Sequence, residues 1–174
     1  MIFALDCDDV LINLMDEWIY RHNHDFDSNL KKEDITDWDI SKFSHPSCGK
    51  NIYKYIEDPS IYDYCKPIEN SLEGVEYLRT LGRVIFVTSW NVGIAGRKYT
   101  WLKDHGYVDS INDYFEAYDK NMIKFNYLID DGIHNLKDPH SGFLFTQPWN
   151  KKFNYYRRIN NWKEFINMKV IWVK

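Results

Sequence analysis

Two aspartates with one residue between them follow the first apolar run of the chain. Asp6 and Asp8 come directly after residues 2–5, a run typical of a buried parallel strand. On a regular strand, side chains two positions apart share a face, so these two carboxylates could bind one divalent metal ion. Carboxylate oxygens favour Mg²⁺, and a carboxylate spared from direct ligation could donate and accept protons. Taken alone, the pair is equally compatible with a turn or a helix cap.

Two more polar pairs stand at the ends of later apolar runs. They are Thr88 with Ser89, after residues 83–87, and Asp130 with Asp131, after residues 125–129. In an open parallel sheet, ligands bind beyond the carboxyl ends of the strands. All three polar pairs would meet at that edge.

Four carboxylates gathered at one place repel each other strongly unless a cation lies among them. If the pairs converge, a bound metal ion is therefore physically required, and Mg²⁺ is the cofactor expected for an all-oxygen site. Asp131 is favoured over Asp130 for direct contact with the metal. The predicted metal ligands are Asp6, Asp8, Asp130 and Asp131.

The elements that must position these residues alternate between strands and helices. Residues 71–81 open with a capping residue and close at Gly82, and residues 96–105 form a second helical stretch. Weaker strand candidates are residues 143–145 and 169–173. This alternation predicts the α/β class with a parallel sheet.

Residues 16–64 do not fit the alternation, because they are polar and rich in aromatic side chains such as Trp18 and Trp38. We interpret them as a small, mainly helical cap inserted after the first strand. The predicted domains are a catalytic core formed by residues 1–15 and 65–174, and a cap formed by residues 16–64.

The composition is that of a globular protein with a slight acidic excess. Of 174 residues, 44% are hydrophobic. The formal charge of −4 argues against an extended electrostatic binding surface for a nucleic acid polymer. No apolar run approaches the roughly 20 residues that span a bilayer, so no membrane partner is expected. Three cysteines without a CxxC pair, and an N-terminus unlike a signal peptide, predict a cytoplasmic location. A homodimer is possible, since the sequence does not determine the oligomeric state.

The motifs, taken in order, resemble the haloacid dehalogenase (HAD) superfamily of phosphatases. They are Asp-Cys-Asp-Asp-Val-Leu at 6–11, Val-Thr-Ser at 87–89, a lysine, and Leu-Ile-Asp-Asp at 128–131, three of them at a strand end. The resemblance implies a Rossmann-like three-layer core and a bound Mg²⁺. Asp9 stands where the commonest form of the first motif has glycine.

The same resemblance assigns roles by motif position. Asp6 would attack phosphorus and carry a transient phosphoryl group, and Asp8 would protonate the leaving oxygen and then activate water. Thr88 would hydrogen-bond the phosphoryl oxygens. Lys120 is favoured over Lys124 as the motif lysine, because its Asp-Lys pair stands ten residues before the last motif. Its ammonium group would neutralise charge on the transferring phosphoryl group.

Over nearly its whole length the chain resembles one branch, the 5'(3')-deoxyribonucleotidase family. The shared landmarks are Asp37-Trp38-Asp39, Pro67-Ile68-Glu69, Lys98-Tyr99 with Trp101, Asp119-Lys120, and Arg157-Arg158-Ile159 with Trp162. The resemblance implies a small-molecule substrate, a nucleoside monophosphate, held by aromatic cap residues. Trp38 matches that cluster best, whereas Ile56 falls where an aromatic is expected. The predicted substrate-binding residues are Trp38, Tyr62, Thr88, Ser89, Trp90 and Lys98.

Other interpretations stay open. The three aromatic candidates could simply pack the cap against the core. The same chemistry would serve a sugar phosphate or another small phosphomonoester, and the sequence fixes neither the base, the sugar nor the 5' or 3' position of the phosphate. A non-catalytic nucleotide-binding module is the remaining alternative, but such a module usually lacks Asp6 or Asp8, and both are present.

Overall fold

The sheet at the centre of the molecule has the parallel arrangement that the sequence predicts. The computed structural model describes residues 1–94 and 96–168. Its strands are β1 (Ile2–Leu5), β2 (Arg83–Ser89), β3 (Tyr114–Ala117), β4 (Tyr127–Asp130), β5 (Gly142–Phe145) and β6 (Arg157–Ile159). Neighbouring strands pair in parallel in the order β3-β2-β1-β4-β5-β6. The strand order reverses beside β1, and open α/β sheets bind their ligands at such a point.

Every predicted strand that falls within the described residues is present. Residues 83–87 lie in β2, residues 125–129 overlap β4, and residues 143–145 lie in β5. The sequence does not predict β3 or β6, because both are short edge strands with polar side chains, which blur the apolar pattern. The remaining predicted strand, residues 169–173, lies outside the described residues.

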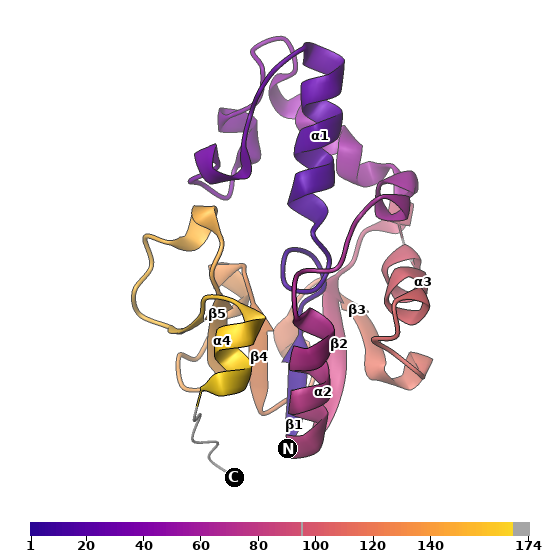
Figure 1. The fold of residues 1–174 in the computed structure, drawn as a ribbon, viewed down its shortest axis with the longest axis vertical. Helices are drawn as coiled ribbons and strands as arrows, with labels where there is room; N and C mark the ends of the chain where they lie inside the picture. The colour runs from indigo at the N-terminus through magenta and orange to yellow at the C-terminus, as the bar shows by residue number, and fades with distance from the viewer. Residues whose placement is uncertain (95, 169–174) are drawn as a thin grey trace.

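Both faces of the sheet are buried, one under α-helices and the other under loop residues such as Leu136, Phe153 and Tyr156. Alternate side chains of β1 enter different clusters, with Phe3 and Leu5 on one face and Ala4 on the other. The first face is covered by α2 (Ser71–Leu81) and α4 (Trp162–Asn167), which lie side by side in front of the sheet (Figure 1). The limits of α2 are those predicted, and α3 (Arg97–Asp104) lies within the second predicted helical stretch.

The contact between α2 and α4 is close because Gly74 has no side chain. A Cβ atom at this position would lie 2.1 Å from Cε3 of Trp162 in α4. The Trp162 indole is fully buried, and its Nε1 donates a hydrogen bond to the Val10 carbonyl at 2.8 Å. The packing of α2 against α4 is thereby connected to the loop that follows Asp8.

The residues between β1 and α2 are mainly helical and lie beyond the carboxyl ends of the strands (Figure 1). They contain α1 (Leu14–Phe26) and the 3₁₀ helices η1 (Lys32–Asp34), η2 (Ile40–Lys42), η3 (Gly49–Glu57) and η4 (Pro59–Asp63). They also have an interior of their own: the Trp18 indole donates to the Ile52 carbonyl at 2.7 Å and meets the Tyr53 ring edge-on. The division into a core and a cap at residues 16–64 stays a prediction; α1 begins two residues before that boundary.

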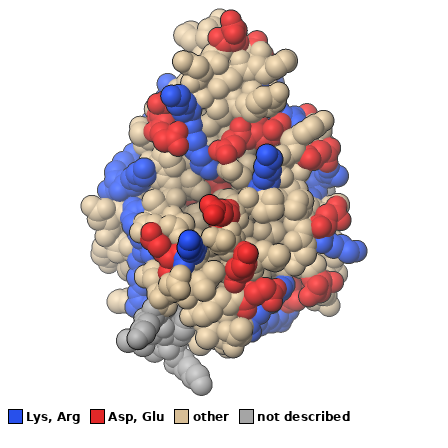
Figure 2. Space-filling view, viewed as in Figure 1, with Lys and Arg blue, Asp and Glu red and all other residues tan. Residues whose placement is uncertain are grey.

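Short 3₁₀ helices complete the loops around the sheet. They are η5 (Val92–Ile94), η6 (Ile111–Asp113), η7 (Lys120–Met122), η8 (Ile133–Asn135) and η9 (Pro148–Asn150). None of the described helices has the length and hydropathy of a membrane span. The three cysteines, Cys7, Cys48 and Cys65, are buried thiols. Figure 2 shows basic and acidic side chains interspersed over the visible face of the molecule.

Candidate active site

Three of the four predicted metal ligands come together at the carboxyl ends of β1 and β4. One carboxylate oxygen from each of Asp6, Asp130 and Asp131 lies within 4.8 Å of the other two. All three side chains are buried. β1 and β4 are adjacent in the sheet, so the end of one strand supplies Asp6 while the end of the other supplies Asp130 and Asp131.

Lys120 lies among these carboxylates. Its Nζ is 2.7 Å from Asp6 Oδ1 and 2.7 Å from Asp130 Oδ2, and the side chain is 1% exposed. It stands in η7, which begins after Asp119, whose carboxylate accepts a hydrogen bond from the Asn121 backbone N–H. Lys124, the other lysine considered, is exposed. The geometry thus brings Lys120 to the place that the motif resemblance implies.

The carboxylate of Asp8 lies outside the three-carboxylate group. Its Oδ2 is 2.7 Å from Lys98 Nζ, and the Tyr62 hydroxyl donates to its Oδ1 at 3.2 Å. Lys98 also donates to Thr88 Oγ1 at 2.8 Å, and Lys98 and Thr88 are both buried. The side chain of Asp8 is therefore placed among hydrogen-bonding groups rather than among the metal-ligand candidates, which suits the proton-transfer role better than the ligand role.

Several groups that hold the carboxylates were not found by reasoning from the sequence. The Trp149 indole donates to Asp131 Oδ2 at 2.8 Å. The Asn135 amide donates to Asp130 Oδ1 at 3.0 Å, beside the Gly132 backbone N–H at 2.8 Å. Asn135 stands five residues after Asp130 in the same loop, so proximity in the sequence could have indicated it. Trp149 comes from a distant loop and carries no such signal.

The electrostatics of the site show an excess of negative charge. Burial raises the pKa of Asp6 despite the opposing charge of Lys120. Burial, followed by the charges of Asp6 and Asp130, raises the pKa of Asp131 well above its usual range. Burial lowers the pKa of Lys120, but Asp130 and Asp6 more than offset this, so the Lys120 pKa is raised and the lysine stays protonated.

A bound divalent cation fits this environment. The donor atoms are all carboxylate oxygens, the donor type that Mg²⁺ prefers. Two lysines, Lys98 and Lys120, face four aspartates, so the fully ionised site keeps a net negative charge. A hard dication among Asp6, Asp130 and Asp131 would relieve their repulsion.

A pocket of about 290 Å³ opens from these groups toward the cap. Its wall is mainly apolar, and the predicted substrate residues Trp38, Tyr62, Thr88, Ser89, Trp90 and Lys98 all line it. Trp38 and Trp90 are 55% and 52% exposed, whereas Tyr62 is 2% exposed. Tyr62 thus offers its hydroxyl to Asp8 rather than a free ring face, while the two tryptophans keep faces that a ligand could cover.

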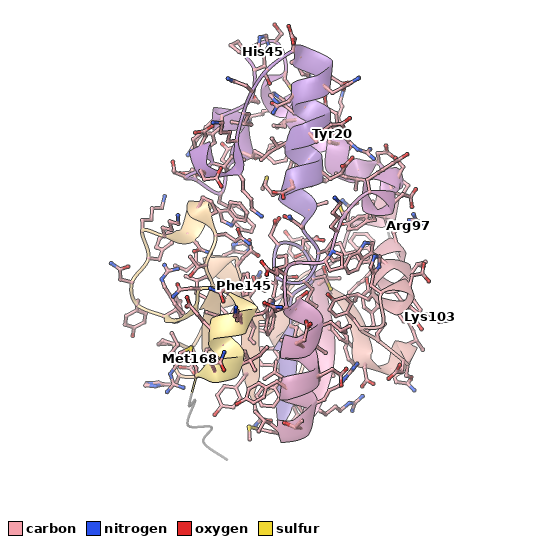
Figure 3. All side chains as sticks on the ribbon, viewed as in Figure 1. Tyr20, His45, Arg97, Lys103, Phe145 and Met168 are labelled. Atoms are coloured by element: carbon pink, nitrogen blue, oxygen red, sulfur yellow. The ribbon has the colours of Figure 1, made fainter. Side chains whose placement is uncertain are left out.

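The mouth of the pocket is bordered by both parts of the chain. Trp38 from the cap meets His134 from the core edge-on, with ring centroids 4.7 Å apart. Arg97, at the start of α3, pairs with Asp63 of η4 near the boundary between cap and core (Figure 3). Ile56, which falls where the family has an aromatic, also lines the pocket.

Two other sequence features have structural roles here. Cys7, which stands between the two aspartates, is fully buried in the core. Arg158 donates to Asn150 Oδ1 at 3.1 Å, and the Asn150 amide donates to the Asp131 carbonyl at 2.9 Å. Arg158 therefore supports the loop beneath Asp131 and does not line the pocket.

Comparison with known proteins identifies the family of this chain. The whole chain, residues 1–174, matches the family described as "5' nucleotidase, deoxy (Pyrimidine), cytosolic type C protein". A 5'(3')-deoxyribonucleotidase of Bacillus subtilis is 31% identical over 166 residues, which cover 94% of this chain and 95% of that protein. One from Clostridium acetobutylicum is 27% identical and covers 92% of this chain and 90% of its own length.

A solved structure supports the fold. A haloacid dehalogenase-like hydrolase from Streptococcus pneumoniae superposes with a TM-score of 0.60 at 14% identity, covering 95% of this chain and 96% of that one. The parallel sheet with its strand-end aspartates is thus a HAD-type core, as the sequence predicts. From this fold and the end-to-end family match, we conclude that the chain is a phosphoric monoester hydrolase that belongs to the family of 5' deoxynucleotidases of the pyrimidine, cytosolic C type.

Proposed function

We propose that this protein removes phosphate from deoxyribonucleoside monophosphates in a Mg²⁺-dependent reaction that passes through a phosphoryl-aspartate on Asp6. The observation that carries the proposal is the buried Lys120, which pairs with both Asp130 and Asp6, together with the position of Asp6 in the wall of the 290 Å³ pocket. A carboxylate held beside a permanently charged ammonium group is suited to receive an anionic phosphoryl group.

Asp6 is fixed before the reaction begins. Its Oδ1 accepts the Cys7 backbone N–H at 2.7 Å and pairs with Lys120 at the same distance. In the first step, a carboxylate oxygen of Asp6 attacks phosphorus while the ester bond to the leaving oxygen breaks. Lys120 remains protonated and offsets the charge on the phosphoryl oxygens.

Asp8 acts as general acid in the first step and as general base in the second. In its protonated form it gives a proton to the leaving oxygen, and as the resulting carboxylate it takes a proton from the water that cleaves the phosphoryl-aspartate. Lys98 and Tyr62 hold its two oxygens, so its position is maintained through the cycle. Thr88, held in turn by Lys98, lies beside Asp8 to hydrogen-bond a phosphoryl oxygen.

The bound cation would be held by Asp6, Asp130 and Asp131, with Trp149 and Asn135 orienting the last two. When bound, Mg²⁺ would supply charge neutralisation among the carboxylates and the phosphoryl oxygens. Three carboxylate donors are available, so the preference for Asp131 over Asp130 stays a prediction.

The nucleoside is proposed to occupy the apolar part of the pocket. The pocket volume of about 290 Å³ lies near the lower limit for small-ligand sites, and Trp38 and Trp90 are each more than half exposed beside it. Aromatic faces stack on bases with about 1–3 kcal/mol each. The relatives named 5'(3')-deoxyribonucleotidase favour this substrate over a sugar phosphate, which would leave the aromatic wall unused. The buried thiols are compatible with the proposed cytoplasmic location.

The deciding experiment measures phosphate release from 5' and 3' ribo- and deoxyribonucleotides and from sugar phosphates, with Mg²⁺ or with EDTA. We expect release from deoxyribonucleotides that requires Mg²⁺, together with a labelled, acid-stable phosphoprotein that is lost in Asp6→Asn. Turnover of sugar phosphates alone would reject the nucleotide substrate and keep the chemistry. Turnover that survives EDTA or Asp6→Asn would reject the mechanism.

A further inference from the structure

Asp9 is a charged residue in a backbone conformation that favours glycine. Its φ is 53°, in the left-handed region, where side chains other than Gly, Asn and Asp are rare. The side chain is buried, since Asp9 is only 4% exposed. Burial of the charge and the positive φ both cost free energy, so interactions with neighbouring groups must offset that cost. The groups that contact the Asp9 carboxylate are therefore of interest.

The Asp9 carboxylate accepts the Met15 backbone N–H at 3.3 Å, and its charged partner is Lys32, which begins η1 in the cap. Lys32 Nζ lies 2.9 Å from Asp9 Oδ1 and 3.1 Å from Asn13 Oδ1. The side chains of Lys32 and Asp9 are 18% and 5% exposed, so water and salt screen this pair less than a surface pair. The bond joins the cap to the loop that directly follows Asp8.

Lys32 also contacts Trp149, a second residue that holds the site together. Its Nζ lies 5.7 Å from the centroid of the Trp149 ring, within the range of a cation–π contact. The same indole donates to Asp131. One cap lysine therefore contacts both the nucleophile loop and the residue that orients Asp131.

The residues that follow Lys32 form part of the pocket wall. Ile35, Trp38 and Ile40 all line the pocket, and Ile35 stands only three residues beyond Lys32. Because the connection is so short, the position of Lys32 limits where this wall can lie. Release of the lysine would let the wall move away from the core.

We propose that Lys32 and Asp9 form a positioning pair that holds the pocket wall of residues 35–40 over the phosphoryl site and so sets the affinity for the nucleoside part of the substrate. This inference rests on the proposed function. Neither side chain contacts the reacting groups in the scheme above, so the pair acts mainly on substrate binding, and the contact of Lys32 with Trp149 affects the chemical step only indirectly.

The test is a double-mutant cycle with deoxyuridine 5'-monophosphate as the probe. Asp9→Gly removes the carboxylate and restores the residue that the backbone favours, and Lys32→Met removes the charge but keeps most of the aliphatic stem. The matched control is Lys31→Met, which removes the exposed neighbouring charge. Asp9→Asn keeps an oxygen acceptor and is expected to lie between wild type and Asp9→Gly.

We expect each single variant to raise KM roughly tenfold, equivalent to about 1.4 kcal/mol, with kcat within about twofold of wild type. The double variant should be no worse than either single one, because both break the same contact. Binding of the nucleotide to the same variants in an Asp6→Asn background, measured by calorimetry, should show the same ratios without turnover.

Three results would overturn the inference: an unchanged KM in both single variants, effects that add in the double variant, or a fall in kcat at constant KM. A wild-type protein that hydrolyses no nucleotide would instead reject the proposed function. An active wild type with unaltered variants would reject only the positioning pair.

Discussion

The core side and the cap side of the pocket are built in different ways. On the core side, Asp6, Lys120, Asp130 and Asp131 are buried, and each is held by at least one hydrogen bond or ion pair. On the cap side, Trp38 is more than half exposed and meets the core through an edge-on contact with His134. The core side is thus a preorganised charge arrangement, whereas the cap side is an apolar surface with room to adjust. Changes on the two sides should therefore alter different kinetic constants.

The largest effect is expected at the nucleophile. Asp6→Asn should lower kcat by about 10⁴ or more, because the amide cannot form the phosphoryl intermediate. Initial-rate assays at saturating substrate measure this loss. The exposed Asp109→Asn is the matched control and should keep wild-type activity. Substantial residual activity in Asp6→Asn would mean that another group carries the reaction.

The next largest effect is expected at the motif lysine. Lys120→Met should lower kcat by about 10²–10³, because two buried carboxylates and the phosphoryl group lose their shared cation. Lys124→Met, four residues away and exposed, should have no effect. Comparable losses in both variants would show that Lys124, and not Lys120 alone, serves the reaction. Circular dichroism of both variants separates misfolding from lost catalysis.

A smaller effect is expected at the cap. Trp38→Ala should raise KM for deoxyribonucleotides by about 5- to 100-fold through lost stacking, with little change in kcat. The same variant should bind a sugar phosphate as the wild type does, because such a ligand has no base to stack. A fall in kcat at unchanged KM would contradict the division between the two sides of the pocket.

The smallest effect is expected on thermal stability as a function of pH. The raised pKa of Asp131 means that the metal-free folded protein holds this proton more tightly than the unfolded chain, where the carboxyl titrates near 3.8. Stability without metal should therefore fall as pH rises from that value through the raised pKa. Mg²⁺ binds the ionised form, so it should raise Tm by a few degrees at about pH 8 and by less at about pH 5.5. Equal increments at both pH values would argue against a metal site that includes Asp131.

The sequence predicted the chemical groups better than it predicted their supports. Each strand-end aspartate could be placed because an apolar run ends immediately before it, and Lys120 because of its distance from the last motif. Asp8 was expected among the metal ligands, yet its carboxylate pairs with Lys98, a distinction that depends on side-chain direction in a loop rather than on a regular strand. Trp149 comes from a loop after β5, and only the folded chain brings it to Asp131.

The contact of Gly74 with Trp162 determines how a substitution far from the pocket could reach the active site. A methyl group at position 74 would meet the indole at 2.1 Å, and the indole is tied to the Val10 carbonyl, four residues beyond the nucleophile. A substitution in α2 would thus displace the catalytic loop although α2 contributes no residue to the pocket wall. Substitutions at Gly74 should therefore lower thermal stability and activity together, although Gly74 is not among the residues that line the pocket.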